Sequence, residues 1–160
     1  MVITGGASGL GLALGQAAGQ SGYSVAVLDV QDELGLTEVS KLQAQNIDAA
    51  YFHCDVSSKA DWQDSYAAVM RHYGRVDVMV NNAGVAYHNV LAMASEEDIS
   101  RMLDINLKAA LLLTKECVRF MLLQNAGHVI NITSIVAERG FAGLAAYSAS
   151  KAGMIAMTRS

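Results

Sequence analysis

The sequence predicts an α/β fold in which a doubly wound parallel sheet has the strand order 3-2-1-4-5. Three observations support this prediction. Short runs rich in β-branched residues alternate with longer segments whose apolar residues recur every three or four positions. The strand-like runs are apolar at most positions, as in a parallel sheet covered on both faces. A glycine-rich turn follows the first of these runs, and right-handed crossovers then favour the doubly wound order.

Each element follows from the same periodicities. The expected strands cover residues 1–4, 23–29, 48–55, 76–80 and 127–134. The expected helices cover residues 9–21, 32–45, 58–73 and 98–124, and a last helix runs from about Tyr147 to the end. Within 98–124, one apolar stripe is expected to include Met102, Ile105 and Leu112 and to carry Lys115 and Arg119 as well. No linker or repeat interrupts this order, so residues 1–160 are expected to form a single domain.

Composition narrows the class of protein further. Hydrophobic residues make up 52% of the 160 residues and charged residues 16%, which is typical of a globular core. A net charge of −4 argues against nucleic acid or an anionic membrane as the main partner. No apolar run approaches the roughly 20 residues that span a bilayer. Cys54 and Cys117 lie far apart and no signal peptide is recognisable, so we expect a cytoplasmic protein with reduced thiols and no metal site.

The turn TGGASGLG, residues 4–11, joins the first expected strand to the first expected helix. Its glycines Gly5, Gly9 and Gly11 permit positive φ and allow a phosphate to approach the backbone closely. The helix N-terminus behind them supplies free N–H groups and the positive end of the helix dipole. A tight turn without a ligand is the alternative reading of the glycines alone. The position between strand and helix favours a dinucleotide pyrophosphate.

Asp29 closes the second expected strand, where a carboxylate can accept hydrogen bonds from both ribose hydroxyls of an adenosine. The alternative is an ordinary polar residue at a strand end. The same carboxylate would repel a 2′-phosphate, and no arginine or lysine follows it directly in DVQDE. The sequence therefore favours NAD(H) over NADP(H) as the cofactor.

Six motifs in order resemble the short-chain dehydrogenase/reductase family over essentially the whole chain. They are TGGASGLG (4–11), CDV (54–56), NNAG (81–84), Asn106 in INL, Ser134 in NITS and YSASK (147–151). The resemblance is general and extends to 3-oxoacyl-carrier-protein reductases and to sugar or polyol dehydrogenases, so it selects no substrate. It implies a Rossmann-like fold and an oxidoreductase that interconverts a secondary alcohol and a ketone. A doubly wound nucleotide-binding domain of another lineage is disfavoured by NNAG and YSASK.

The resemblance also implies which residues would form the site. The implied catalytic residues are Asn106, Ser134, Tyr147 and Lys151. The implied cofactor-binding residues are Gly5, Ser8, Gly9, Leu10, Gly11, Asp29, Asp55, Val56, Asn82, Ala83, Gly84, Tyr147 and Lys151. Asp55 and Val56 would flank the adenine, and Asn106 would support a water that links Lys151 to solvent. Each of these residues alone also has a purely structural reading.

The chemistry of Tyr147 and Lys151 can be argued without the resemblance. Ketone reduction needs a proton at the oxygen, and alcohol oxidation needs that proton removed. Lys151 lies one helical turn from Tyr147, where its ammonium would stabilise the phenolate form of such an acid or base. Ser134 is expected at a strand end, from which its hydroxyl would polarise the substrate oxygen. Tyr87, His88, Glu138 and Phe141 are weaker candidates for the substrate pocket.

The pattern differs from the family at the C-terminus. Relatives continue with further strands and a proline-containing turn, and this sequence has no proline. The resemblance therefore implies a C-terminally truncated chain, whose fifth strand becomes a sheet edge and whose turnover is slow or absent. A non-catalytic dinucleotide-binding or interaction module is the alternative function. Relatives commonly pair through helices equivalent to 98–124 and 147–160, which implies a homo-oligomer.

Overall fold

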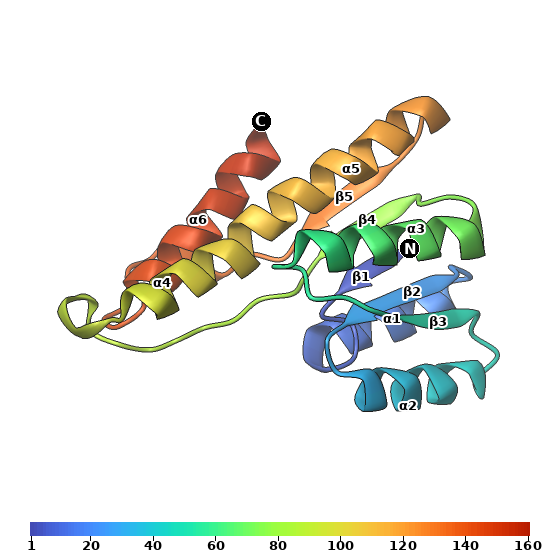
Figure 1. The fold of residues 1–160 in the computed structure, drawn as a ribbon, viewed down its shortest axis with the longest axis horizontal. Coiled ribbons are helices and arrows are strands. Elements are labelled where there is room, and N and C mark those ends of the chain that lie inside the picture. The colour runs from blue at the N-terminus through green and yellow to red at the C-terminus, as the bar shows by residue number, and fades with distance from the viewer.

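A five-stranded parallel sheet of order β3-β2-β1-β4-β5 forms the centre of the molecule (Figure 1). The computed structural model describes all residues 1–160. The strands are β1 (Val2–Thr4), β2 (Val25–Asp29), β3 (Ala49–His53), β4 (Val78–Asn81) and β5 (His128–Asn131). The helices are α1 (Gly9–Gln20), α2 (Asp32–Gln43), α3 (Lys59–Tyr73), α4 (Glu96–Leu103), α5 (Ala109–Gln124) and α6 (Ala145–Arg159). The predicted fold class and strand order are confirmed.

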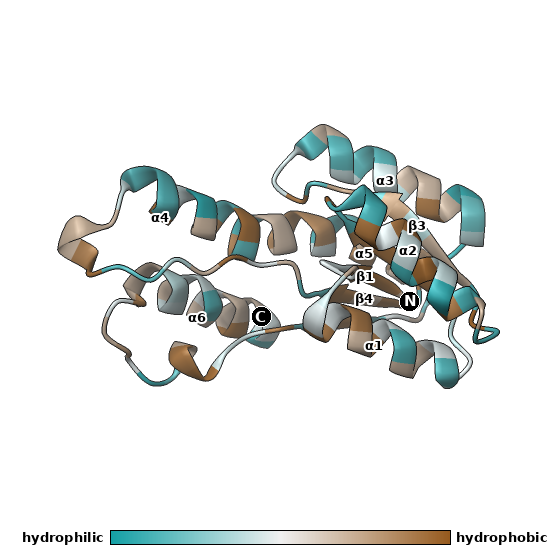
Figure 2. Cartoon of the chain, turned by 90° about the horizontal axis from the view of Figure 1, so that it is seen from below, coloured by the Kyte–Doolittle hydropathy of each residue, from teal (hydrophilic) through white to brown (hydrophobic).

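Two separate cores cover the two faces of the sheet. Alternate residues of one strand point to opposite faces, so Val2 belongs to the core under α3 and α5 and Ile3 to the core under α1 and α2. In the same way, Ala26 belongs to the core under α3 and α5, and Val25 to the core under α1 and α2. In Figure 2 the brown, apolar strands lie between helices whose outer faces are largely teal. Burial on both sides explains why these strands are apolar at most positions.

The expected helix 98–124 is a continuous helical run in which a π-helical segment separates the α-helices α4 and α5. It begins earlier, at Glu96, because the side chain of Ser95 accepts a hydrogen bond from the Asp98 N–H at 3.0 Å and caps the helix. Residues Asp104–Lys108 form a π-helical segment between α4 and α5. The expected stripe is wrong in α5: Lys115 and Arg119 are exposed, and the core side consists of Ala109, Ala110, Leu113, Cys117 and Met121.

The sheet ends at β5, which pairs only with β4. This strand is shorter than the expected range 127–134, and Ile130 is 44% exposed. Helix α6 packs against α4 and the π-helical segment, and Met154 is buried there. The expectation that the fifth strand forms a sheet edge is thus confirmed. None of the helices is long and apolar enough to cross a membrane.

Candidate functional site

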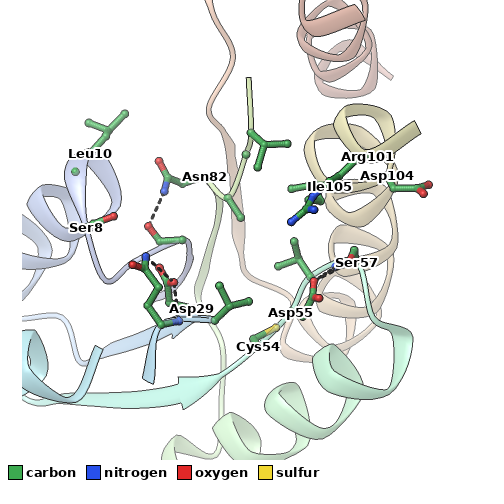
Figure 3. A pocket seen from close by; sticks show the side chains of 18 of the residues that line it. Ser8, Leu10, Asp29, Cys54, Asp55, Ser57, Asn82, Arg101, Asp104 and Ile105 are labelled. Carbon is green, nitrogen blue, oxygen red and sulfur yellow. Dashed lines mark hydrogen bonds between the residues drawn. The ribbon is translucent and has the colours of Figure 1, made fainter. Parts of the chain in front are cut away.

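A cavity of about 870 Å³ opens at the carboxyl ends of β1, β2, β3 and β4 (Figure 3). This is the edge of a doubly wound sheet at which ligands bind, and the volume lies within the usual range for a cofactor site. The glycine turn, the ends of β2 and β3, the NNAG segment and one side of α4 line it. Ten of the expected cofactor-binding residues are among its walls: Gly5, Ser8, Gly9, Leu10, Asp29, Asp55, Val56, Asn82, Ala83 and Gly84.

The glycine turn holds its shape through close backbone packing. Gly5 and Gly9 have φ of 62° and 51°, in the left-handed region that glycine adopts readily. Gly11 is buried behind the turn rather than in the cavity wall, and a Cβ there would lie 2.2 Å from the carbonyl oxygen of Gly5. Asn82 donates from Nδ2 to the carbonyl oxygens of Thr4 and Gly5, at 3.0 and 2.9 Å. Its side chain therefore positions the turn.

The first turn of α1 is open to a ligand. Ser8 is the N-cap residue, but its side chain makes no capping hydrogen bond. The backbone N–H groups of Gly9, Leu10 and Gly11 donate to no group of the chain. Free N–H groups at a helix N-terminus, next to a wall that glycines leave open, suit a phosphate or pyrophosphate. The residues of the turn therefore fit the anionic centre of a dinucleotide.

Asp29 is fixed at the end of β2, and only 6% of it is exposed. Its Oδ2 accepts a hydrogen bond from the Ala7 N–H at 3.1 Å, and its Oδ1 accepts one from the Gln31 N–H at 3.2 Å. The Gln31 amide adds a longer contact of 3.4 Å. A carboxylate held in this way keeps remaining lone pairs for hydroxyl groups in the cavity. It fits the ribose of an adenosine.

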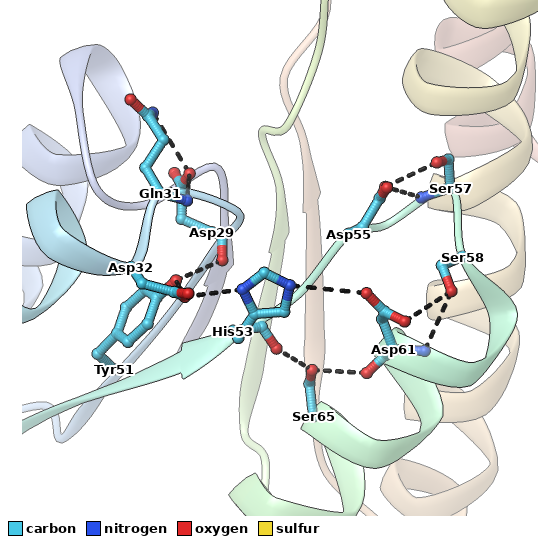
Figure 4. A network of polar contacts seen from close by, with 10 residues as sticks. All are labelled: Asp29, Gln31, Asp32, Tyr51, His53, Asp55, Ser57, Ser58, Asp61 and Ser65. Atoms are coloured by element: carbon cyan, nitrogen blue, oxygen red, sulfur yellow. Dashed lines mark hydrogen bonds and ion pairs between the residues drawn. The ribbon is translucent and has the colours of Figure 1, made fainter.

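Polar contacts also join the ends of β2 and β3 (Figure 4). His53 Nδ1 lies 2.7 Å from Asp32 Oδ1, and its Nε2 lies 3.7 Å from Asp61 Oδ2. The hydrogen bond with Asp32 raises the pKa of His53. Asp55 accepts hydrogen bonds from the hydroxyl and N–H groups of Ser57, and these contacts lower the pKa of Asp55. Asp55 is therefore an ionised acceptor at neutral pH.

Asn106 and Lys151 meet beside Gly84. A Cβ at Gly84 would lie 3.2 Å from Asn106 Oδ1 and 3.5 Å from Lys151 Nζ. Asn106 is buried, and its side chain exchanges two hydrogen bonds with the backbone of Val85 and donates a third to Ser150 Oγ. Lys151 Nζ donates to the carbonyl oxygen of Ile132 at 2.8 Å, and burial lowers the pKa of Lys151. The lysine has further N–H groups for a ligand or water.

Ser134 and Tyr147 both follow β5 in the chain, Ser134 just after the strand and Tyr147 in α6. Lys151 Nζ is 5.9 Å from the centre of the Tyr147 ring, so the two side chains share one side of α6. Ser134 lies beyond the end of β5 and caps a short 3₁₀ turn, where Oγ accepts a 3.4 Å hydrogen bond from the Val136 N–H. Its own hydroxyl proton is free. Phe141 and Glu138 are exposed nearby in the chain.

Sequence reasoning missed three residues of this region. Ser150 is fully buried and links Asn106 to the carbonyl oxygen of Tyr147, to which it donates at 2.8 Å. Its place three residues after Tyr147, on the same side of a helix, was the available signal. Gln31 and Arg101 line the cavity. Nothing in the local pattern distinguishes either from a solvated residue.

Comparison with known proteins agrees with this geometry. The family model described as short chain dehydrogenase matches residues 1–160. A 3-oxoacyl-[acyl-carrier-protein] reductase of Chlamydia pneumoniae is 31% identical over 160 residues, covering 100% of this chain and 64% of the relative. Tropinone reductase-like 1 of Erythroxylum coca is 35% identical, covering 99% and 58%.

The match to a solved structure extends the similarity to the backbone. A candidate gluconate dehydrogenase from Agrobacterium tumefaciens superposes with a TM-score of 0.95 at 26% identity, covering 99% of this chain and 62% of that one. The chain therefore spans roughly three fifths of the length of these relatives. The resemblance predicted from the ordered motifs is confirmed: the chain belongs to the short-chain dehydrogenase family.

Proposed function

We propose that this chain carries the cofactor-binding and catalytic residues of an NAD(H)-dependent oxidoreductase that interconverts a secondary alcohol and a ketone. The observation that carries the proposal is the cavity of about 870 Å³, with unpaired N–H groups of α1 on one wall and the fixed carboxylate of Asp29 next to them. The family uses a nicotinamide dinucleotide, and these residues fit its pyrophosphate and adenosine ribose. Asp29 favours NAD(H), because its charge repels a 2′-phosphate.

A bound nicotinamide dinucleotide would supply or accept the hydride at the substrate carbon. The chain supplies the proton: the Tyr147 hydroxyl donates it to the ketone oxygen in reduction and takes it back in oxidation. Ser134 has a free hydroxyl proton with which it would polarise the same oxygen. Lys151, held by the carbonyl oxygen of Ile132, stabilises the phenolate and holds the nicotinamide ribose. Asn106 fixes the Val85 backbone beside this group.

A dinucleotide-binding module without turnover is the second candidate, and one observation favours it. Ile135 and Phe141, which follow β5, are 60% and 51% exposed, and β5 pairs with β4 alone. Water in such a site weakens the electrostatic interactions on which catalysis depends. Steady turnover of a secondary alcohol by this chain would exclude the second candidate.

The proposal also covers the cellular location and the oligomeric state of the protein. Cys54 and Cys117 are buried free thiols, which fit the reducing conditions of the cytoplasm. We place homo-oligomer contacts on α5 and α6. In α5 the apolar side chains of Phe120, Leu122 and Leu123 are 38%, 70% and 81% exposed, which supports an interface there.

The test is a fluorescence titration of the chain with NADH and with NADPH. We expect saturable binding of NADH at lower concentration than NADPH, and Asp29→Asn should narrow this difference. Tyr147→Phe should abolish any turnover of secondary alcohols but retain most of the NADH binding, because it removes only the hydroxyl. Tighter binding of NADPH would contradict the role of Asp29, and equal turnover by Tyr147→Phe would contradict that of Tyr147.

A further inference from the structure

Helix α4 presents one polar side to the dinucleotide cavity. Five residues of α4 and of the π-helical segment after it line the cavity: Glu97, Ser100, Arg101, Asp104 and Ile105. The spacing of these residues, three and four apart, places them on a single helical side. Figure 3 shows this helix across the cavity from the glycine turn and from Asp29. The wall is thus built by a regular element and would remain in place when a ligand enters.

Arg101 is the only lysine or arginine that lines the cavity, and its guanidinium makes no ion pair within the chain. Arg75 pairs with Asp77, and Arg119 pairs with Glu116 one helical turn away. Arg101 has carboxylates at the equivalent helical positions, Glu97 four residues before it and Asp104 three residues after it, yet it makes an ion pair with neither. Asp104 pairs instead with Lys108, at 3.0 Å. The guanidinium is left for the cavity.

The carboxylate of Asp55 lines the same part of the cavity as Arg101. Both line the cavity, and the charge of Arg101 contributes to the lowered pKa of Asp55, after the larger effect of Ser57. The two groups are close enough to interact through space, but no ion pair joins them. Figure 3 places Arg101 and Asp55 on the same side of the cavity, away from Ser8 and Leu10. An acceptor and a planar cation therefore border one space.

This space suits an adenine ring. The N6 amino group of adenine donates hydrogen bonds, which an ionised Asp55 accepts. A guanidinium stacks on the face of an aromatic ring, with both cation–π and stacking contributions. On the basis of the function proposed above, we infer that Arg101 stacks on the adenine of the dinucleotide and is a specificity-determining residue for it. Asp29 then holds the ribose, and α1 the pyrophosphate.

The alternative ligand for a free guanidinium is a phosphate group, and the local charge argues against it. Glu97, Asp104 and Asp55 line the same cavity, so the lining on this side has three carboxylates and only one guanidinium. A phosphate dianion would add two negative charges to this group and would be repelled. A neutral aromatic ring keeps the attraction of the guanidinium without this repulsion. The charges near Arg101 therefore favour the binding of an adenine ring over that of a phosphate group.

The experiment compares the Kd of NADH with that of reduced nicotinamide mononucleotide, which lacks the adenosine, by fluorescence titration. Arg101→Ala should raise the Kd of NADH by about 3- to 30-fold, the usual range for a cation–π contact. Arg101→Lys should recover only part of this loss, because an ammonium keeps the cation–π attraction but lacks the planar stacking surface. Neither substitution should change the Kd of the mononucleotide. Arg71→Ala, at an exposed position outside the cavity, is the matched control and should leave both values unchanged.

Circular dichroism of each variant first verifies that the fold is retained, as alanine in a helix predicts. An unchanged NADH Kd in Arg101→Ala would overturn the inference while leaving the proposed function intact. Full recovery of binding in Arg101→Lys would also overturn it, since charge and not stacking would then be responsible. If the unaltered chain binds no NADH at all, the proposed function fails and the inference fails with it.

Discussion

Replacing Asn106 by alanine should destabilise the fold far more than an ordinary asparagine substitution. The Asn106 side chain is 1% exposed and makes three hydrogen bonds, of 2.8 Å to the Val85 N–H, 2.8 Å to the Val85 carbonyl oxygen and 3.0 Å to Ser150 Oγ. Each bond contributes about 0.5–1.5 kcal/mol net, and the groups left without a partner add a desolvation cost. We expect a loss of about 2–4 kcal/mol in the free energy of unfolding.

Urea unfolding followed by circular dichroism measures this loss. With a slope of about 2 kcal/mol/M, typical of a small domain, the midpoint should fall by roughly 1–2 M. Asn89→Ala is the matched control, since Asn89 is exposed and donates one hydrogen bond, to the Met93 carbonyl oxygen. Its midpoint should move by less than about 0.5 M. Equal shifts in Asn106→Ala and Asn89→Ala would refute the reasoning that the three buried contacts hold the segment after NNAG.

Two further predictions concern the glycine turn and the histidine at the end of β3. Gly11→Ala should abolish NADH binding, because the new Cβ would lie 2.2 Å from the Gly5 carbonyl oxygen and displace the turn. In Gly9→Ala the new Cβ would have no atom within 4 Å, but φ is 51°. This variant should lose only about 1–2 kcal/mol of stability. Equal NADH affinities in the two variants would contradict this. Asp32 raises the pKa of His53 in the folded state. The pair therefore stabilises the fold fully at pH values below the pKa of histidine in the unfolded chain, about 6.5. This stabilisation is lost as the pH rises through the higher pKa of the folded state. His53→Gln should remove this part of the pH dependence of the urea midpoint between pH 5 and 9, and identical profiles would contradict it.

The order of the sheet could be predicted because it depends on patterns that local sequence carries. Strands buried on both faces must be apolar at successive positions, and right-handed crossovers leave few arrangements for alternating strands and helices. The predicted ends of the strands were less accurate than the predicted order of the sheet. β5 ends at Asn131, and Ser134, expected at its end, caps a 3₁₀ turn instead. The last hydrogen bond to β4 runs from the Ile132 N–H to the Asn81 carbonyl oxygen, and no residue preference marks this point.

Most of the dinucleotide cavity could be predicted because its walls are the loops that follow the strands. Gly5, Asp29 and Asp55 occur where a strand has just ended, and the topology brings these ends together. Arg101 comes from a helix and lies at least 46 residues from Gly5, Asp29 and Asp55. Only the rotation of α4 about its own axis decides whether Arg101 faces the cavity or solvent. That rotation is set by tertiary packing.

The π-helical segment Asp104–Lys108 explains why the periodicity of residues 98–124 misled the prediction of the buried side. A π turn accommodates one more residue than an α turn, so the side chains after it are rotated by about 100° relative to an uninterrupted helix. Before the segment, Ser100 and Arg101 face the cavity; after it, Leu113 and Cys117 face the sheet. One helical period cannot describe both sides. The extra residue thus lets a single helical run form the cavity wall, bury Asn106 beside Lys151 and cover the sheet.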